Sequence, residues 1–165
     1  MLTEIARRLL RVLTFKPDVF VEIRDDEQAT LQAAIVVLVT SVLWAIGIGT
    51  RAGLLVGLLF GPLVLWLLWT SVAWLLGTRL LGGQGSWLGL ARVLGYVTAP
   101  LAIGVLGLVP CGGLLAAPIS WLLAAALSYL AMREALELSS ERALLTALLS
   151  ISVAPIAWTL LRHLL

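Results

Sequence analysis

Few side chains in this sequence could take part in binding or catalysis, and they lie in short stretches beside long apolar runs. Arginines in such positions can bind a lipid headgroup, because a guanidinium pairs with phosphate through parallel hydrogen bonds. Arg92 is the most informative of them, since it falls inside an apolar run. A proline four residues after Tyr96 frees a backbone carbonyl that a neighbouring hydroxyl could engage. The resulting candidate site for lipid or a partner comprises Arg79, Arg92, Tyr96, Pro100, Arg133 and Glu134.

The same residues also have a plainer interpretation as structural anchors. The sequence favours this interpretation and leaves the binding site as the alternative. Basic residues beside apolar runs anchor a membrane protein in one orientation. Arg92 and Glu134 could form an ordinary salt bridge, and the Tyr96–Pro100 pair is consistent with a kink that packs helices. These residues therefore serve either as a site or as topology anchors.

Catalytic groups are missing from the apolar runs. Intramembrane proteolysis needs carboxylates, a serine with a base, or a metal, and proton-coupled transport needs an ionisable group deep in hydrocarbon. Acidic residues occur only in the N-terminal region and at 134–141, while Cys111 and His163 are single. We expect no catalytic, cofactor-binding or metal-ligating residues, no nucleic-acid partner, and a protein that is not an enzyme.

The composition indicates a membrane protein, because 61% of the residues are hydrophobic and 12% are charged. A soluble domain of this size could not cover so much apolar surface. The apolar runs are continuous rather than alternating, which favours helices over barrel strands. We predict an all-α polytopic fold with five transmembrane helices in a bundle, at about 29-49, 54-77, 87-109, 114-132 and 144-161.

Residues 1-28 are expected to form a cytoplasmic, interfacial amphipathic region ahead of the transmembrane domain at 29-165. Leu2, Ile5, Leu9, Val12 and Leu13 recur at helical spacing, which predicts a helix in the headgroup plane. The basic residues of this helix, Arg7, Arg8 and Arg11, lie on its other side, toward anionic lipid. A second short helix should restart at Pro17–Asp18, with Phe20 and Ile23 on its apolar side.

The positions of the basic residues predict an orientation. Five spans with the N-terminus inside place nine basic residues on the inner side: Arg7, Arg8, Arg11, Lys16, Arg24, Arg79, Arg92, Arg133 and Arg142. Only Arg51 and Arg162 are then outside. Because inner loops of membrane proteins carry the excess of Lys and Arg, the N-terminus should be cytoplasmic and the C-terminus outside. The expected location is the bacterial cytoplasmic membrane.

Four short segments, in this order, make the chain similar to a known family: Lys16-Pro17-Asp18-Val19-Phe20-Val21-Glu22-Ile23, Leu80–Ser86 leading into Arg92–Pro100, Arg133-Glu134, and Leu138-Ser139 with Glu141-Arg142-Ala143. The chain resembles the Yip family of Ypt/Rab-interacting membrane proteins, in a bacterial form. That resemblance implies a five-helix bundle with a cytosolic N-terminal region. Eukaryotic members act in vesicle trafficking and contact small GTPases. The N-terminal region here is shorter than their GTPase-binding tails, so this role is not expected to carry over.

The leading hypothesis is a non-enzymatic inner-membrane protein of Yip type that organises membrane or partner proteins. The alternative is a small transporter, channel or lipid-translocating protein. Expected partners are membrane lipids, including anionic headgroups at the inner leaflet, and a second copy of the chain or another membrane protein. A continuous polar cavity between helices would favour transport, and a packed bundle with an interfacial helix would favour the organising role.

Overall fold

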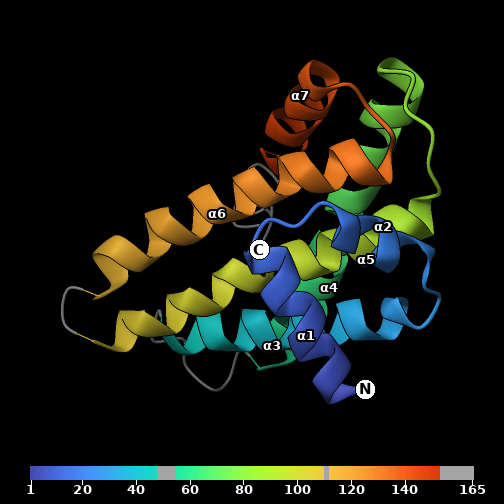
Figure 1. Ribbon diagram of the computed structural model, residues 1–165. Helices are drawn as coiled ribbons and strands as arrows, with labels where there is room; N and C mark the ends of the chain where they lie inside the picture. Colours follow the sequence, from blue (N-terminus) through green and yellow to red (C-terminus); the bar gives the residue numbers. More distant parts are fainter. Residues whose placement is uncertain (48–54, 110–111, 153–165) are drawn as a thin grey trace.

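The computed structural model describes residues 1–47, 55–109 and 112–152, and regular structure in this part of the chain is helical (Figure 1). Two short helices come first, α1 (Leu2–Leu13) and α2 (Asp18–Asp25). The longer elements are α3 (Ala29–Gly47), α4 (Leu55–Leu75) with a π-helical turn η2 (Leu76–Leu80), α5 (Trp87–Val97) with a 3₁₀ helix η3 (Ala99–Leu108), α6 (Gly112–Ala135) and α7 (Ser140–Ile151).

Four of these segments are long and apolar enough to cross a membrane: Ala29–Gly47, Gly61–Leu80, Trp87–Leu108 and Gly112–Ala135. They correspond to the first four predicted spans, so the prediction of an all-α polytopic membrane fold is confirmed. The fifth predicted span, 144–161, begins within α7 and otherwise lies outside the described residues. The chain is an integral membrane protein.

The third span changes helix type in its middle. The α-helical part ends at Val97, and a 3₁₀ helix continues from Ala99. Pro100 supplies the reason, since it has no backbone N–H for the carbonyl four residues earlier. The hydroxyl of Thr98 donates to the carbonyl of Gly95 at 2.7 Å, satisfying one acceptor at the break. The predicted disturbance of the helix at Pro100 is therefore present.

The long elements run side by side, with the short N-terminal helices packed against them (Figure 1). α3 packs against α5 and η3, and α6 packs against η3, α5 and α7. Gly95 allows the first of these contacts, because a Cβ there would lie 2.6 Å from the Cβ of Ala33. α2 lies between α5 and α6.

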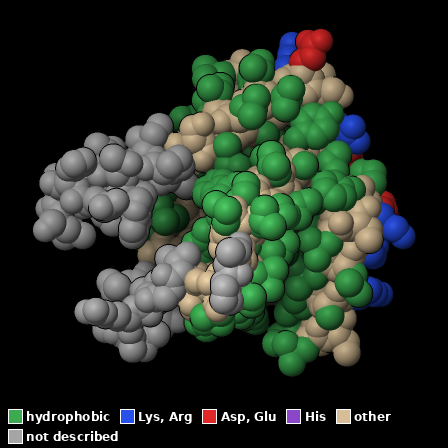
Figure 2. Space-filling view, turned by 90° about the vertical axis from the view of Figure 1, so that its left-hand side faces the viewer, with side chains coloured by type: hydrophobic (Ala, Val, Ile, Leu, Met, Phe, Trp, Pro, Cys, Tyr) green, Lys and Arg blue, Asp and Glu red, His purple; other side chains and the backbone are tan. Residues whose placement is uncertain are grey.

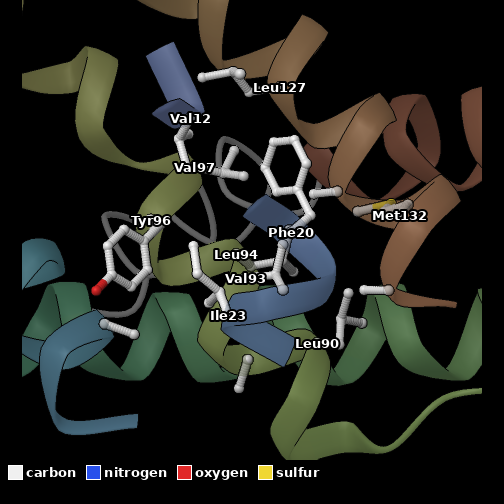
Figure 3. Close-up of a cluster of buried hydrophobic side chains, with 14 of the residues drawn as sticks. Val12, Phe20, Ile23, Leu90, Val93, Leu94, Tyr96, Val97, Leu127 and Met132 are labelled. Atoms are coloured by element: carbon white, nitrogen blue, oxygen red, sulfur yellow. The ribbon is translucent and has the colours of Figure 1, made fainter. Parts of the chain in front are cut away.

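Apolar side chains of α1, α2, α5 and α6 meet where the short helices join the bundle (Figure 3). Phe20 and Ile23 of α2 are fully buried, as expected for its apolar side. Around them lie Val12 of α1, Leu94 of α5 and other core residues. Burying a side chain of this size stabilises the fold by about 1.5–3 kcal/mol. The N-terminal helices are therefore part of the core.

Ionisable side chains of the described residues gather in one region, which we call the charged end. It comprises α1, α2, the loop 81–86, the α6–α7 turn at 136–139, and the adjoining turns of the longer elements. These turns carry Arg79, Arg92, Arg133, Glu134, Glu141 and Arg142. In the view of Figure 2, Lys, Arg, Asp and Glu are confined to the right edge and the top of a largely hydrophobic face. The hydrogen bond from Arg142 to the carbonyl of Leu81, at 3.0 Å, links α7 to this region.

α1 has three distinct faces. Ile5 and Val12 point inward and are buried, while Arg7 and Arg11 lie on a charged face. Leu2 and Leu10 lie on a third face and are 73% and 66% exposed. A helix with apolar residues both toward the bundle and away from it, and with charges between, suits the boundary between headgroups and acyl chains.

Candidate functional site

Arg8 is the buried charge of the charged end, with 3% of its surface exposed. It lies on α1 between Ile5 and Val12, three and four residues away, and helical periodicity places all three on one face. Its guanidinium contacts one amide oxygen and three carboxylates: Gln32 (3.0 Å), Asp26 (2.7 Å), Glu22 (3.2 Å) and Glu4 (3.3 Å). We expected Arg8 to face anionic lipid, and that prediction was wrong.

These contacts perturb the ionisation of the whole group. Burial alone would lower the pKa of Arg8, but hydrogen bonds to Asp26 and Glu22 outweigh it, and the pKa lies above the ordinary value. The Arg8 guanidinium in turn lowers the pKa of Asp26 from its ordinary 3.8. For Glu22, desolvation opposes the shift, but Arg11 and Arg8 lower its pKa below the ordinary 4.5. All three groups are thus charged at neutral pH.

Gln32, in the first turns of α3, connects this ion-pair group to the bundle. It is 2% exposed, and its side-chain oxygen accepts from Arg8 and, at 2.6 Å, from the hydroxyl of Tyr96. Tyr96 lies on α5 and is fully buried (Figure 3). Because arginine only donates, the Gln32 oxygen must face Arg8 and the amide nitrogen must point the other way. We call Arg8, Glu22, Asp26, Gln32 and Tyr96 the Arg8 network.

A second set of contacts holds the C-terminal end of α2. Arg24 donates to the backbone carbonyl of Glu134 at 3.2 Å and to the carboxylate of Glu137 at 3.1 Å, joining α2 to the end of α6. Arg92 of α5 donates to the carbonyl of Arg24 at 2.9 Å and to the hydroxyl of Thr30 at 2.8 Å. A cation at a helix C-terminus also interacts favourably with the helix dipole.

The structure does not bring the six predicted residues together. Tyr96 belongs to the Arg8 network, and Arg92 braces α2 and α3. The proposed Arg92–Glu134 salt bridge is absent from the described contacts, because Glu134 pairs with its neighbour Arg133 at 2.7 Å. The two remaining residues are apart from these groups: Arg79 is exposed in η2 and Pro100 is buried where α5 meets η3.

Sequence reasoning missed Arg8, Glu22, Asp26 and Gln32 as partners. Two signals could have found them. Arg8 is the one arginine of α1 placed between inward-facing apolar residues, and Gln32 is a lone amide in the first turns of an apolar span. A buried polar group requires hydrogen-bond partners. The positions of Arg8 and Gln32 therefore indicated a polar contact for each, but the sequence alone could not identify the partner.

Beside the Arg8 network, α3, α4, α5 and the start of α1 line an open groove of about 710 Å³. Its apolar wall includes Trp66, Leu67 and Leu88, and the indole of Trp66 is fixed by donating to the carbonyl of Ala91 at 3.0 Å. Polar side chains line its other part: Glu4, Glu27, Gln28, Thr30 and Gln32. The groove thus combines an apolar part within the spans and a polar part at the charged end.

Within residues 1–47, 55–109 and 112–152, no group of three or more His, Cys, Asp or Glu side chains could hold a metal ion. The sequence model of the Yip1 domain matches residues 10–161. No curated protein and no solved structure matches the chain.

Proposed function

The chain belongs to the Yip1 domain family, and we propose that it is a non-enzymatic protein of the bacterial cytoplasmic membrane that organises membrane or partner proteins. The charged end would face the cytoplasm, with the N-terminus inside and the C-terminus outside. The orientation is supported by the distribution of basic residues, because nine of the 11 Lys and Arg residues belong to the segments of this end.

The observation that carries this proposal is the docking of α1 and α2 on the bundle. Both helices are held by buried apolar residues and by the Arg8 network rather than tethered loosely. Docking leaves the apolar face of α1, with Leu2 and Leu10, exposed at a fixed height on the bundle. A preorganised surface binds with a smaller entropy cost than a disordered tail. Such a surface suits a protein that positions lipids or other membrane proteins.

The packing of the helices supports the same conclusion. Where α3 crosses η3, a Cβ on Gly104 would lie 2.2 Å from the indole of Trp44, so the two elements are in direct contact. Charged side chains inside the four candidate spans, Arg79, Arg92, Arg133 and Glu134, lie in the turns nearest the charged end. A translocation path requires polar groups along the span, and these side chains do not supply them.

A lipid-translocating activity is the second candidate, and the groove between α3, α4 and α5 is the observation that favours it. The two functions differ in vesicles that contain the purified full-length chain. We expect a fluorescent phospholipid to stay in its original leaflet, and an entrapped small ion to stay inside, at the rates seen in empty vesicles. Faster lipid exchange or ion leakage would replace the organising role with transport.

The organising role itself is tested by crosslinking in the native membrane. We expect a defined crosslinked species, to a second copy or another membrane protein, that is lost when α1 is undocked by Arg8→Met. The exposed Arg7→Met should retain it. A crosslinked species that is still formed by the Arg8→Met variant would show that the charged end is not the organising surface.

A further inference from the structure

We propose that the groove between α3, α4 and α5 binds one glycerophospholipid with a primary ammonium headgroup. Its volume of about 710 Å³ is within the usual range for ligand sites. Leu31, Leu67 and Leu88 line it and are 62%, 39% and 50% exposed on membrane-spanning helices. Because the medium around these side chains is lipid, an acyl chain is the occupant that the apolar wall accommodates.

Gln32 supplies the polar contact inside the groove. Its oxygen is held by Arg8 and Tyr96, which turns its Nε2 amide group away from both donors. Among the described residues this Nε2 donates no hydrogen bond. Gln32 lines the groove, and 2% of its surface is exposed. The buried side-chain polar atom without a partner in the described part of the chain is the Ser120 hydroxyl, so the Gln32 Nε2 is not enclosed by protein and is open to an acceptor in the groove. The phosphate and ester oxygens of a glycerophospholipid are such acceptors.

Charge selects the headgroup. The charged side chains that line the groove among the described residues are the carboxylates of Glu4 and Glu27. Met1 also lines it, and its single amino group leaves one carboxylate in excess. Glu4 already contacts Arg8, whereas Glu27 has no ion pair within the described part of the chain. A primary ammonium offers both a positive charge and N–H donors to these carboxylates. A glycerol headgroup has no ammonium, so the negative charge of its phosphate would lie uncompensated beside these carboxylates.

This site goes beyond the proposed organising role and does not depend on it. It also differs from the anionic-lipid site expected at the inner-face arginines, since Arg92 donates to protein acceptors and Arg133 pairs with Glu134. A resident lipid would fill the groove beside α1 and add to the surface that the charged end presents.

The test is native mass spectrometry of the full-length chain, released from membranes that contain equal amounts of three phospholipids with identical acyl chains. The headgroups are ethanolamine, choline and glycerol. We expect one retained ethanolamine lipid, in about fivefold excess over the choline lipid, because choline keeps the positive charge but has no N–H to donate to the carboxylates. Retention in proportion to the supplied mixture, or a preference for the anionic glycerol headgroup, would overturn the proposal.

Two variants identify the groove as the site. Gln32→Glu keeps the oxygens that Arg8 and Tyr96 require but removes the amide donor, so the fold is retained while lipid retention falls. Glu27→Gln removes the unpaired carboxylate from an exposed position and should abolish the ethanolamine preference. Glu141→Gln, an exposed carboxylate in the first turn of α7 outside the groove, is the matched control and should retain the parent's preference. If both groove variants bind lipid as the parent does, the assignment to this groove is wrong.

Discussion

Replacing Arg8 by methionine should release α1 from the bundle without unfolding the spans. Methionine keeps an unbranched apolar stem for packing beside Ile5 and Val12 but removes the guanidinium. Asp26 then loses its only recorded ion pair among the described residues, while Glu22 keeps Arg11. The change therefore tests the charge rather than the apolar contact.

The magnitude follows from burial. Removing one partner of a fully buried ion pair costs about 3–5 kcal/mol. The carboxylates of Glu22, Asp26 and Glu4 are 32%, 29% and 37% exposed, so water compensates part of this loss. We expect about 3 kcal/mol, which raises the population with α1 undocked roughly 100-fold.

Hydrogen–deuterium exchange of the full chain in lipid nanodiscs measures this population directly. The amides of α1 should exchange about 100-fold faster in Arg8→Met than in the parent, while those of α5 and α6 change little. Arg7→Met is the matched control, because that side chain is 63% exposed and its ion-pair distances are 3.8 Å. It should change α1 exchange by less than about threefold. Equal effects of the two substitutions, or none from Arg8→Met, would refute the role assigned to the buried guanidinium.

Three further predictions concern packing, the network and pH. Gly95→Val should lower the thermal unfolding temperature by forcing α3 from α5, at a cost of about 1–3 kcal/mol, because its Cβ would meet Ala33 at 2.6 Å. Gly61→Ala is its control, with no atom within 4 Å of the added Cβ, and an unfolding temperature as low as that of Gly95→Val would contradict the argument. Tyr96→Phe removes one hydrogen bond and should speed α1 exchange about fivefold, for a loss of about 1 kcal/mol, whereas unchanged exchange would show that the bond is unimportant. The folded-state pKa of Asp26 is lowered below its ordinary 3.8, so the ion pair contributes fully to α1 docking above pH 3.8 and is lost as the pH falls through the folded-state pKa. Proteolysis of α1 in the parent should therefore increase over this acid range. An equal increase in Arg8→Met would exclude the Arg8–Asp26 pair as its source.

The sequence was sufficient to predict the apolar helices and several of their ends. Pro17 precedes α2, which begins at Asp18, and Phe20 and Ile23 are buried as its amphipathic pattern predicted. These features depend on local composition and helical periodicity, which are properties of consecutive residues. The interruption of the third span at Pro100 was predictable for the same reason.

The partners of the charged residues were not predictable in this way. The periodicity of α1 placed Arg8 beside Arg7 and Arg11, but only the docked position of α1 turns Arg8 inward. The Arg92–Glu134 pairing failed because it assumed a register between α5 and α6, and Arg92 instead meets Arg24 and Thr30. Which helices are neighbours, and at which height, is a property of packing between helices distant in sequence.

We propose that the charged end is a single surface on the cytoplasmic side of the membrane. This proposal is tested by replacing Cys111 with serine and introducing one cysteine at a time at exposed positions of this end: Thr3, Gln84 and Glu137. A membrane-impermeant thiol reagent should label all three in inverted membrane vesicles and none of them in intact cells. Labelling of any of the three from outside intact cells would contradict the account.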